Sequence, residues 1–191
     1  MQAFDQLTLR TERLILRPLR RGDEGALFTI YSDPAFMRYW NTPPWSTLAQ
    51  AESTIEEDLA ALPAGAYLRL GIQEAGAEAI VGTCALFALH EPSRRAELGY
   101  GLAPAAQGRG YMGEALAALL EFAFGTLGLN RIEADIDPGN EASARTLARL
   151  GFVQEGYFRE RWIVAGQVSH SAMYGLLRAD WDARRAKDPS P

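Results

Sequence analysis

The chain has 191 residues, 48% of them hydrophobic and 23% charged, which is typical of a single globular domain. Its formal net charge of −5 argues against a nucleic-acid partner, because phosphates require a basic face. No apolar run approaches the roughly 20 residues that cross a bilayer, and the first residues lack the features of a signal peptide. The lone cysteine, Cys84, cannot form an internal disulfide and is expected in the core. We therefore expect a cytoplasmic protein without a membrane partner.

In the first half of the chain, capping and turn residues separate short apolar patterns. Asp23 is placed to cap a helix that runs to Tyr31, and Ser46 or Thr47 to cap the next helix. An aromatic, proline-rich loop over residues 39–45 lies between them. The expected elements are, in order, a strand over 14–18, a helix over 23–31, a helix over 46–62, and a strand pair over 67–73 and 80–89.

The second half has clearer patterns. Residues 131–137 alternate strictly between apolar and polar side chains, as a half-buried strand does. Asn140 is an expected N-cap, and Gly151 is expected to end the helix that follows it. The expected elements are a strand over 97–102, a helix over 114–127, a strand over 131–137, a helix over 140–150, and a hairpin of strands over 153–163 and 168–177. This order predicts one mixed sheet with helices on both faces, an α/β fold in the broad sense.

The most informative stretch is Gln107-Gly108-Arg109-Gly110-Tyr111-Met112-Gly113-Glu114, between a short apolar strand and a helix. The first turn of a helix leaves about four backbone N–H groups unpaired, and the helix dipole adds roughly half a positive charge there. Three glycines let an anion approach the backbone closely. We therefore expect this loop to bind a phosphate or a pyrophosphate.

Two common phosphate-binding patterns do not explain the loop. A P-loop needs a lysine followed by Ser or Thr, and neither is present. Gly108 to Gly113 does match the Gly-x-Gly-x-x-Gly pattern of dinucleotide-binding folds, with Glu133 at 20 residues beyond Gly113. However, nearly half of the chain precedes the loop, and too little follows it for a doubly wound sheet.

Read as Gln-x-x-Gly-x-(Gly or Ala), the loop resembles the acetyl-CoA pyrophosphate loop of the GNAT N-acetyltransferases, with Met112 in place of the last small residue. The segment Thr11–Pro18 resembles the opening strand of the RimJ/RimL branch, the ribosomal-protein-alanine acetyltransferase type. Further segments resemble the superfamily in its own order: Ala96–Tyr100, Asn140–Gly156 and Tyr174–Trp181. The resemblance covers residues 7–181, which we expect to form one domain, followed by a polar tail over 182–191.

The resemblance implies the GNAT acyl-CoA N-acyltransferase fold, with a central mixed sheet of six to seven strands. In that fold the strand before the loop splays from the strand after the next helix. The pantetheine arm of acetyl-CoA, the implied co-substrate, enters between them. No metal is implied, and His90 and His170 are far apart in the sequence. The implied cofactor-binding residues are Leu102, Ala103, Gln107, Gly108, Arg109, Gly110, Tyr111, Met112, Gly113, Glu114, Asn140 and Ser143.

Acetyl transfer also requires a neutral amine. Neutralising a lysine at pH 7 costs about 4–5 kcal/mol, but an α-amine costs only about 1 kcal/mol. A carboxylate acting through water, or a water chain lined by carbonyl groups, could serve the α-amine. Glu97, on the strand that leads into the loop, is the candidate general base. Its alternative is a solvated glutamate that balances Arg94 and Arg95. A covalent route through Cys84 has no histidine nearby in the sequence.

Ser143 is the second candidate catalytic residue. In the family a hydroxyl at the matching position is sometimes proposed as the acid that protonates the leaving thiolate. The weak acidity of serine instead favours a role in orienting the sulfur or donating a hydrogen bond to it. The candidate substrate-binding residues are Tyr39, Trp40 and Trp45, since aromatic side chains are costly to expose in a loop. Their alternative role is to cover the core.

Two further positions concern the acceptor side. Glu160 is expected to form an exposed ion pair with a flanking arginine, Arg159 or Arg161. His170 stands where the last strand of the family commonly has an acidic residue. The strand over 168–177, if it is a sheet edge, could pair between subunits, so a monomer and a homodimer are both compatible with the sequence.

The residues and the resemblance together predict an acetyl-CoA-dependent N-acetyltransferase in which the amine attacks directly in a ternary complex. The RimJ/RimL likeness implies a protein N-terminal α-amine as acceptor. Three alternatives remain open: an N-acetyltransferase of small molecules such as polyamines, amino acids or antibiotics, a non-catalytic acyl-CoA-binding module, and a generic phosphate-binding domain.

Overall fold

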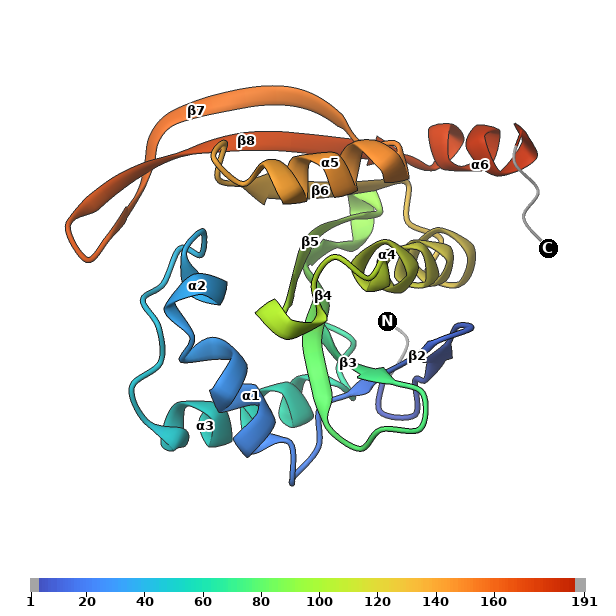
Figure 1. The fold of residues 1–191 in the computed structure, drawn as a ribbon. Helices are drawn as coiled ribbons and strands as arrows, with labels where there is room; N and C mark the ends of the chain where they lie inside the picture. The colour runs from blue at the N-terminus through green and yellow to red at the C-terminus, as the bar shows by residue number, and fades with distance from the viewer. Residues whose placement is uncertain (1–3, 188–191) are drawn as a thin grey trace.

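The computed structural model describes residues 4–187, which form one mixed sheet with helices around it (Figure 1). The sheet has eight strands in the order β1-β2-β3-β4-β5-β6-β8-β7. All neighbouring strands are antiparallel except β5 and β6, which are parallel. The strands are β1 (Leu9–Arg10), β2 (Leu14–Pro18), β3 (Leu68–Glu74), β4 (Ile80–His90), β5 (Arg95–Leu102), β6 (Arg131–Ile136), β7 (Val153–Val164) and β8 (Gln167–Leu177).

The mixed sheet is confirmed, but the expected number of six to seven strands was too low. The strand that the sequence did not reveal is β1, which pairs Leu9 with Leu16 and Arg10 with Ile15 of β2. Two residues are too few to show an alternating pattern. The strand over 168–177 is also not an edge, because β8 lies between β6 and β7. The exposed edge at this end of the sheet is β7.

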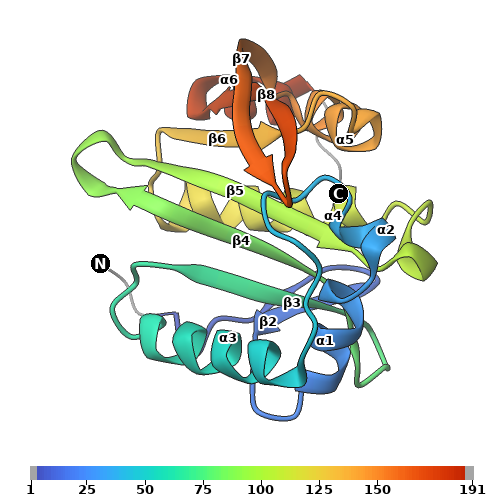
Figure 2. The ribbon, with the colours of Figure 1, turned by 90° about the vertical axis from the view of Figure 1, so that its left-hand side faces the viewer.

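Helices cover both faces of the sheet, as expected (Figures 1 and 2). On one face, Leu27, Ile30 and Ile55 of α1 and α3 share a hydrophobic cluster with α2. On the other face, α4 and α5 bury Leu116 and Leu147 against the main core. The helices are α1 (Glu24–Tyr31), α2 (Pro34–Met37), α3 (Leu48–Ala61), α4 (Tyr111–Glu121), α5 (Glu141–Leu150) and α6 (Arg178–Lys187).

Two helix boundaries and the capping role of Asp23 differ from the sequence expectation. Helix α4 begins at Tyr111, directly after the loop, and not at Glu114, and it ends in a π-helical turn over Phe122–Thr126. Asp23 does occupy the N-cap position of α1, but its side chain forms no cap hydrogen bond. It accepts instead from the Arg20 backbone N–H at 2.9 Å and pairs with Arg17 at 2.7 Å.

The last residues that the structure describes form a helix, which includes part of the expected polar tail over 182–191. Helix α6 runs to Lys187, and the buried Trp181 packs against Phe124, with ring centroids 6.1 Å apart. The part of the expected tail over residues 188–191 lies outside the described residues. Within residues 4–187, none of the helices has the length and apolar character required to cross a membrane.

Candidate active site

The glycine-rich loop leads into the N-terminus of α4 through two left-handed residues. Gly108 and Gly110 have φ angles of 74° and 80°, which favour glycine. Among the described residues, no side chain caps α4. Within residues 4–187, the backbone N–H groups from Gly108 to Gly113 donate no hydrogen bond to the protein. A row of free donors at the positive end of a helix is suited to bind an anion.

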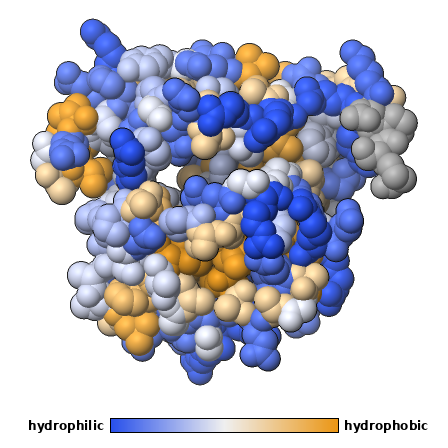
Figure 3. Space-filling model, viewed as in Figure 1, coloured by the Kyte–Doolittle hydropathy of each residue, from blue (hydrophilic) through white to orange (hydrophobic). Residues whose placement is uncertain are grey.

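The parallel strands β5 and β6 separate along their length. They pair only over Arg95–Glu97 and Arg131–Glu133, although both strands continue beyond these residues. A cavity of about 900 Å³ extends from this opening to the loop and α5. The space-filling view shows the corresponding face hollowed between the upper layer, with β6 and α5, and the lower part of the molecule (Figure 3). The splayed strand pair expected from the sequence is therefore present.

Most of the residues assigned to the cofactor come together around this cavity. Ala103 does not line it and donates its backbone N–H to Val81 O at 2.8 Å. Arg109 and Glu114 also lie outside the lining, because Arg109 pairs with Glu74 at 2.9 Å and Glu114 pairs with Arg13 at 2.6 Å. The assigned residues that do line the cavity are Leu102, Gln107, Gly108, Gly110, Tyr111, Met112, Gly113, Asn140 and Ser143.

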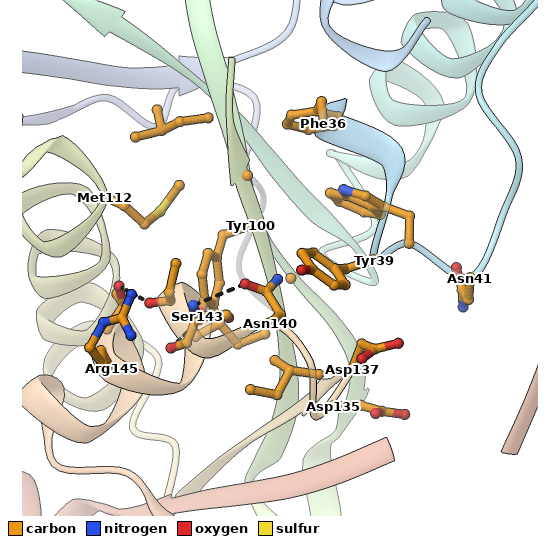
Figure 4. Close-up of a pocket in the computed structure, with 18 of the residues that line it drawn as sticks. Phe36, Tyr39, Asn41, Tyr100, Met112, Asp135, Asp137, Asn140, Ser143 and Arg145 are labelled. Carbon is orange, nitrogen blue, oxygen red and sulfur yellow. Dashed lines mark hydrogen bonds between the residues drawn. The ribbon is translucent and has the colours of Figure 1, made fainter. Parts of the chain in front are cut away.

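At the N-terminus of α5, a short chain of hydrogen bonds fixes Ser143. Asn140 caps the helix as expected, and its Oδ1 accepts from the Ser143 backbone N–H at 3.1 Å. The Ser143 hydroxyl shares a 2.6 Å hydrogen bond with the hydroxyl of Tyr100 on β5. Figure 4 shows Ser143 and Asn140 pointing into the space beside Tyr100. Burial raises the pKa of Tyr100 to about 12, so this hydroxyl keeps its proton at neutral pH.

Glu97 lies on the opposite face of the sheet from Tyr100. Side chains alternate along a strand, so Glu97 and Tyr100, three positions apart on β5, face opposite sides. Both nevertheless line the cavity, because the cavity passes through the opening between β5 and β6. Within the described part of the chain, Glu97 forms no ion pair, since Arg95 binds Glu133 at 3.0 Å instead. The expected alternative, a glutamate balanced by its neighbours, is not what the contacts show.

Two more carboxylates join Glu97 on this side. Asp135 of β6 pairs with Arg161 of β7 at 3.1 Å. Asp137 accepts a hydrogen bond from the Gly139 backbone N–H at 2.7 Å, which closes the turn before α5. Figure 4 shows both aspartates close to each other and to the side of Tyr39. An acceptor that enters here meets three carboxylates and one guanidinium, which favours a cation.

The aromatic loop after α2 contributes part of the wall. Tyr39 and Trp40 line the cavity, as expected for substrate-binding residues. Trp45 does not, because its ring stacks on the buried Tyr31 with centroids 4.6 Å apart. A Cβ at Gly101 on β5 would lie 2.6 Å from the ring of Phe36, so this glycine lets the α2 aromatics approach the strand.

Besides His170, the β7–β8 hairpin supplies two cavity residues that the sequence analysis did not assign to the acceptor, Trp162 and Ser171. Trp162 Nε1 donates to the buried Ser171 Oγ at 3.2 Å, and both line the cavity with His170. Glu160 is exposed, has a left-handed φ of 54°, and its backbone N–H donates to His170 Nδ1 at 2.9 Å. In the described residues Glu160 forms none of the expected ion pairs, because Arg161 binds Asp135.

The residues that sequence reasoning missed are those whose roles depend on register. Tyr100 belonged to a recognised motif but carried no chemical signal of its own. Asp135 lay in a plain alternating strand, and only its pairing with Met173 on β8 places it against the hairpin. The irregular register between Phe158 and Trp162 brings Arg161 to Asp135, and no local pattern predicts such a bulge.

Cys84 is fully buried on β4 and does not line the cavity. Burial raises the pKa of its thiol to about 12, so the reactive thiolate is not available at neutral pH. This position does not support the covalent route. Within residues 4–187, no group of three or more His, Cys, Asp or Glu side chains could hold a metal ion.

A sheet opened between two parallel strands, with free loop N–H groups at one end of the opening, is the arrangement that the sequence resemblance implied for an N-acetyltransferase. Residues 13–153 match the acetyltransferase (GNAT) domain, and the chain belongs to this family of N-acetyltransferases. It is 34% identical to the uncharacterized N-acetyltransferase p20 of Bacillus licheniformis, over 91% of this chain and 98% of that protein. It is 27% identical to the [ribosomal protein uS5]-alanine N-acetyltransferase of Escherichia coli, over 94% and 95%.

Solved structures agree on the fold. A GNAT-family acetyltransferase from Bacillus anthracis has a TM-score of 0.81 at 23% identity, over 91% of this chain and 99% of that one. The spermidine N-acetyltransferase of Vibrio cholerae, in complex with CoA and spermine, has a TM-score of 0.80 at 23% identity, over 90% and 99%. At these identities the likeness is one of fold.

Proposed function

We propose that the chain transfers the acetyl group of acetyl-CoA to the α-amine of a protein N-terminus, by direct attack in a ternary complex. One observation carries the proposal: a single cavity joins the loop of free N–H groups on one face of the sheet to Glu97 on the other. Donor and acceptor can therefore approach from opposite faces and meet at the opening between β5 and β6. We propose the cytoplasm as the location of the reaction, in keeping with a chain whose one cysteine forms no internal disulfide.

The residues on the donor side fit a pyrophosphate and a thioester arm. The N–H groups from Gly108 to Gly113 would bind the pyrophosphate, and a Cβ at Gly108 or Gly113 would meet nothing within 4 Å, so the loop surface is open. The arm would lie along the unpaired part of β5, ending beside Ser143. The Ser143 hydroxyl, held by Tyr100, would donate a hydrogen bond to the sulfur as the thiolate leaves.

On the acceptor side, Glu97 would take the proton of the amine, directly or through one water. An α-amine needs only a weak base, because its pKa of about 7.7–8.0 leaves a sizeable neutral fraction at pH 7. The carboxylates of Asp135 and Asp137 would attract the ammonium form before this proton leaves. The relative that acts on ribosomal protein uS5, aligned over 94% of this chain, supports a protein N-terminus as acceptor.

A polyamine is the second candidate acceptor, because three carboxylates line the same side of the cavity. The two candidates differ in what surrounds the amine. A peptide places an uncharged backbone next to its amine, whereas a polyamine places further positive charges there. The fold likeness to a spermidine N-acetyltransferase is compatible with the second candidate and does not decide between them.

The test is a panel of acceptors with acetyl-CoA, read by mass spectrometry of the product and by release of free thiol. The panel contains peptides with free N-termini, the same peptides with blocked N-termini and an internal lysine, and spermidine. We expect acetylation at the α-amine of free peptides. Product only on spermidine would favour the second candidate, and no product on any amine would overturn both.

A substitution in the loop tests acetyl-CoA binding separately from a general loss of stability. Gly113→Leu fills the loop surface with a side chain at a position whose Cβ would meet no atom within 4 Å. Gly25→Leu in α1 is the matched control, since its Cβ is equally free and it lies outside the cavity. Thermal stabilisation by acetyl-CoA at about 100 times the dissociation constant, roughly 2.7 kcal/mol, should be lost in the first variant and kept in the second.

A further inference from the structure

The N-terminal turn between β1 and β2 contacts the cofactor loop from the side away from the cavity. Arg13 NH1 donates to the backbone carbonyl of Arg109 at 3.0 Å. Its guanidinium also lies over the ring of Tyr111, 5.0 Å from the centroid. Arg13 itself does not line the cavity, whereas Gly110 and Tyr111 do. Arg13 therefore contacts the loop without occupying the cavity.

The hydrogen bond from Arg13 to the Arg109 carbonyl fixes the direction in which the next N–H group of the loop points. The peptide bond between Arg109 and Gly110 is trans, so its C=O and N–H groups point in opposite directions. Because Arg13 holds the carbonyl, the N–H of Gly110 points away from Arg13. A loop whose glycines allow several backbone conformations is thereby held in one of them.

The same turn binds the acidic residue in the first turn of α4. Glu114 Oε1 accepts from the Thr11 hydroxyl at 2.5 Å and from the Arg13 backbone N–H at 2.9 Å. Glu114 Oε2 accepts from Arg13 Nε at 2.7 Å. Burial alone would raise the pKa of Glu114, but these hydrogen bonds from Thr11 and Arg13 lower it below its ordinary value. Both carboxylate oxygens are therefore occupied.

This arrangement removes a competitor from the anion site. A carboxylate in the first turn of a helix is attracted to the free N–H groups there. Glu114 would then occupy the donors that the phosphate needs and would also repel its charge. Thr11 and Arg13 bind both carboxylate oxygens of Glu114 instead, and the Arg13 guanidinium neutralises their charge.

We infer that Thr11, Arg13 and Glu114 are positioning residues that hold the cofactor loop in its anion-binding conformation and keep Glu114 from capping its own helix. The inference rests on the proposed use of acetyl-CoA, because the anion is its pyrophosphate. It assigns a function to the Thr-x-Arg segment, which the sequence showed only as the start of a strand.

The test compares two donors in Arg13→Met and Glu114→Gln variants. Acetyl-CoA contains the pyrophosphate, and S-acetylpantetheine has the thioester arm without it. We expect the KM for acetyl-CoA to rise about tenfold or more in each variant, as loss of a charge-assisted contact predicts, with kcat nearly unchanged. The kcat/KM for S-acetylpantetheine should stay within about twofold of the parent value.

Arg21→Met is the matched control, because it removes an exposed ion pair with Glu56 of 2.9 Å far from the loop. Equal losses with both donors would show a general structural effect and overturn the inference, as would a KM for acetyl-CoA equal to that of the control. Hydrogen exchange of the peptide spanning residues 107–118, measured without any donor, should be faster in Arg13→Met than in Arg21→Met. Equal exchange would also overturn the inference. A parent protein that binds no CoA would overturn the proposed function. The hydrogen-exchange result would still decide whether Thr11, Arg13 and Glu114 hold the loop in one conformation.

Discussion

The hydroxyl of Tyr100 lies 2.6 Å from the hydroxyl of Ser143, and this contact joins β5 to the first turn of α5. It spans the part of the sheet where β5 and β6 no longer pair. The two residues lie 43 positions apart in the chain. Ser143 is almost fully buried, at 8% exposure, so its hydroxyl has few alternative partners. The contact therefore sets the direction in which Ser143 can donate.

Tyr100→Phe should lower kcat about tenfold and change the KM for acetyl-CoA little, because Ser143 would lose its fixed orientation but the loop would remain intact. Ser143→Ala should have a similar effect. The double variant should be no slower than the slower single variant, since both changes remove the same interaction. Steady-state kinetics and denaturant unfolding of all four proteins provide the measurement. Additive losses in kcat would show that the two hydroxyls act independently.

Glu97→Gln should reduce kcat/KM for a peptide acceptor by roughly 10²–10⁴-fold, the range that general-base catalysis contributes. The remaining rate should rise with pH as the acceptor amine deprotonates in solution. Glu52→Gln, on the exposed surface of α3, is the control and should behave as the parent. If Glu97→Gln retains activity within about threefold, another carboxylate or a water chain acts as base.

Local signals in the sequence predicted most of the fold, and they predicted the donor side better than the acceptor side. The loop, the cap at Asn140 and the hairpin of β7 and β8 all depend on short-range chemistry that can be read along the chain. The role of Glu114 could not be read in this way, because Arg13 lies 101 residues away. The same holds for Arg161 and Asp135, which meet only through the register of two strands and a bulge.

Asp58 should make the stability of the protein depend on pH. This aspartate of α3 is 6% exposed and lies 3.3 Å from Arg69, and its burial raises its pKa from 3.8 to about 6, with Arg69 acting in the opposite direction. A carboxyl whose pKa is raised in the folded state stabilises the fold below its unfolded pKa, and this contribution is lost as the pH rises through the folded pKa.

The parent protein should therefore lose stability relative to Asp58→Asn between about pH 4 and pH 6, by up to roughly 3 kcal/mol. Urea unfolding at several pH values measures the difference. Asp5→Asn, an exposed position, is the control for the overall charge change. A parent-minus-variant difference that rises with pH would mean that Arg69 stabilises the charged carboxylate more than burial destabilises it.

Arg161 should influence the choice between a peptide and a polyamine. Its guanidinium neutralises Asp135 at 3.1 Å and lies over the rings of Phe158 and Trp162, at 5.0 and 5.7 Å from their centroids. A polyamine brings several positive charges toward this guanidinium, whereas a peptide brings only its α-amine, followed by neutral backbone. Arg161→Gln frees the Asp135 carboxylate and removes the repulsion. We expect the ratio of kcat/KM for spermidine to that for a peptide to rise about three- to tenfold.

Arg159→Gln removes a neighbouring charge that does not line the cavity and should leave the ratio unchanged. Equal shifts of this ratio in both variants would reflect only the net charge of the protein. The change in the ratio caused by Arg161→Gln should become smaller at high salt, which screens the charges.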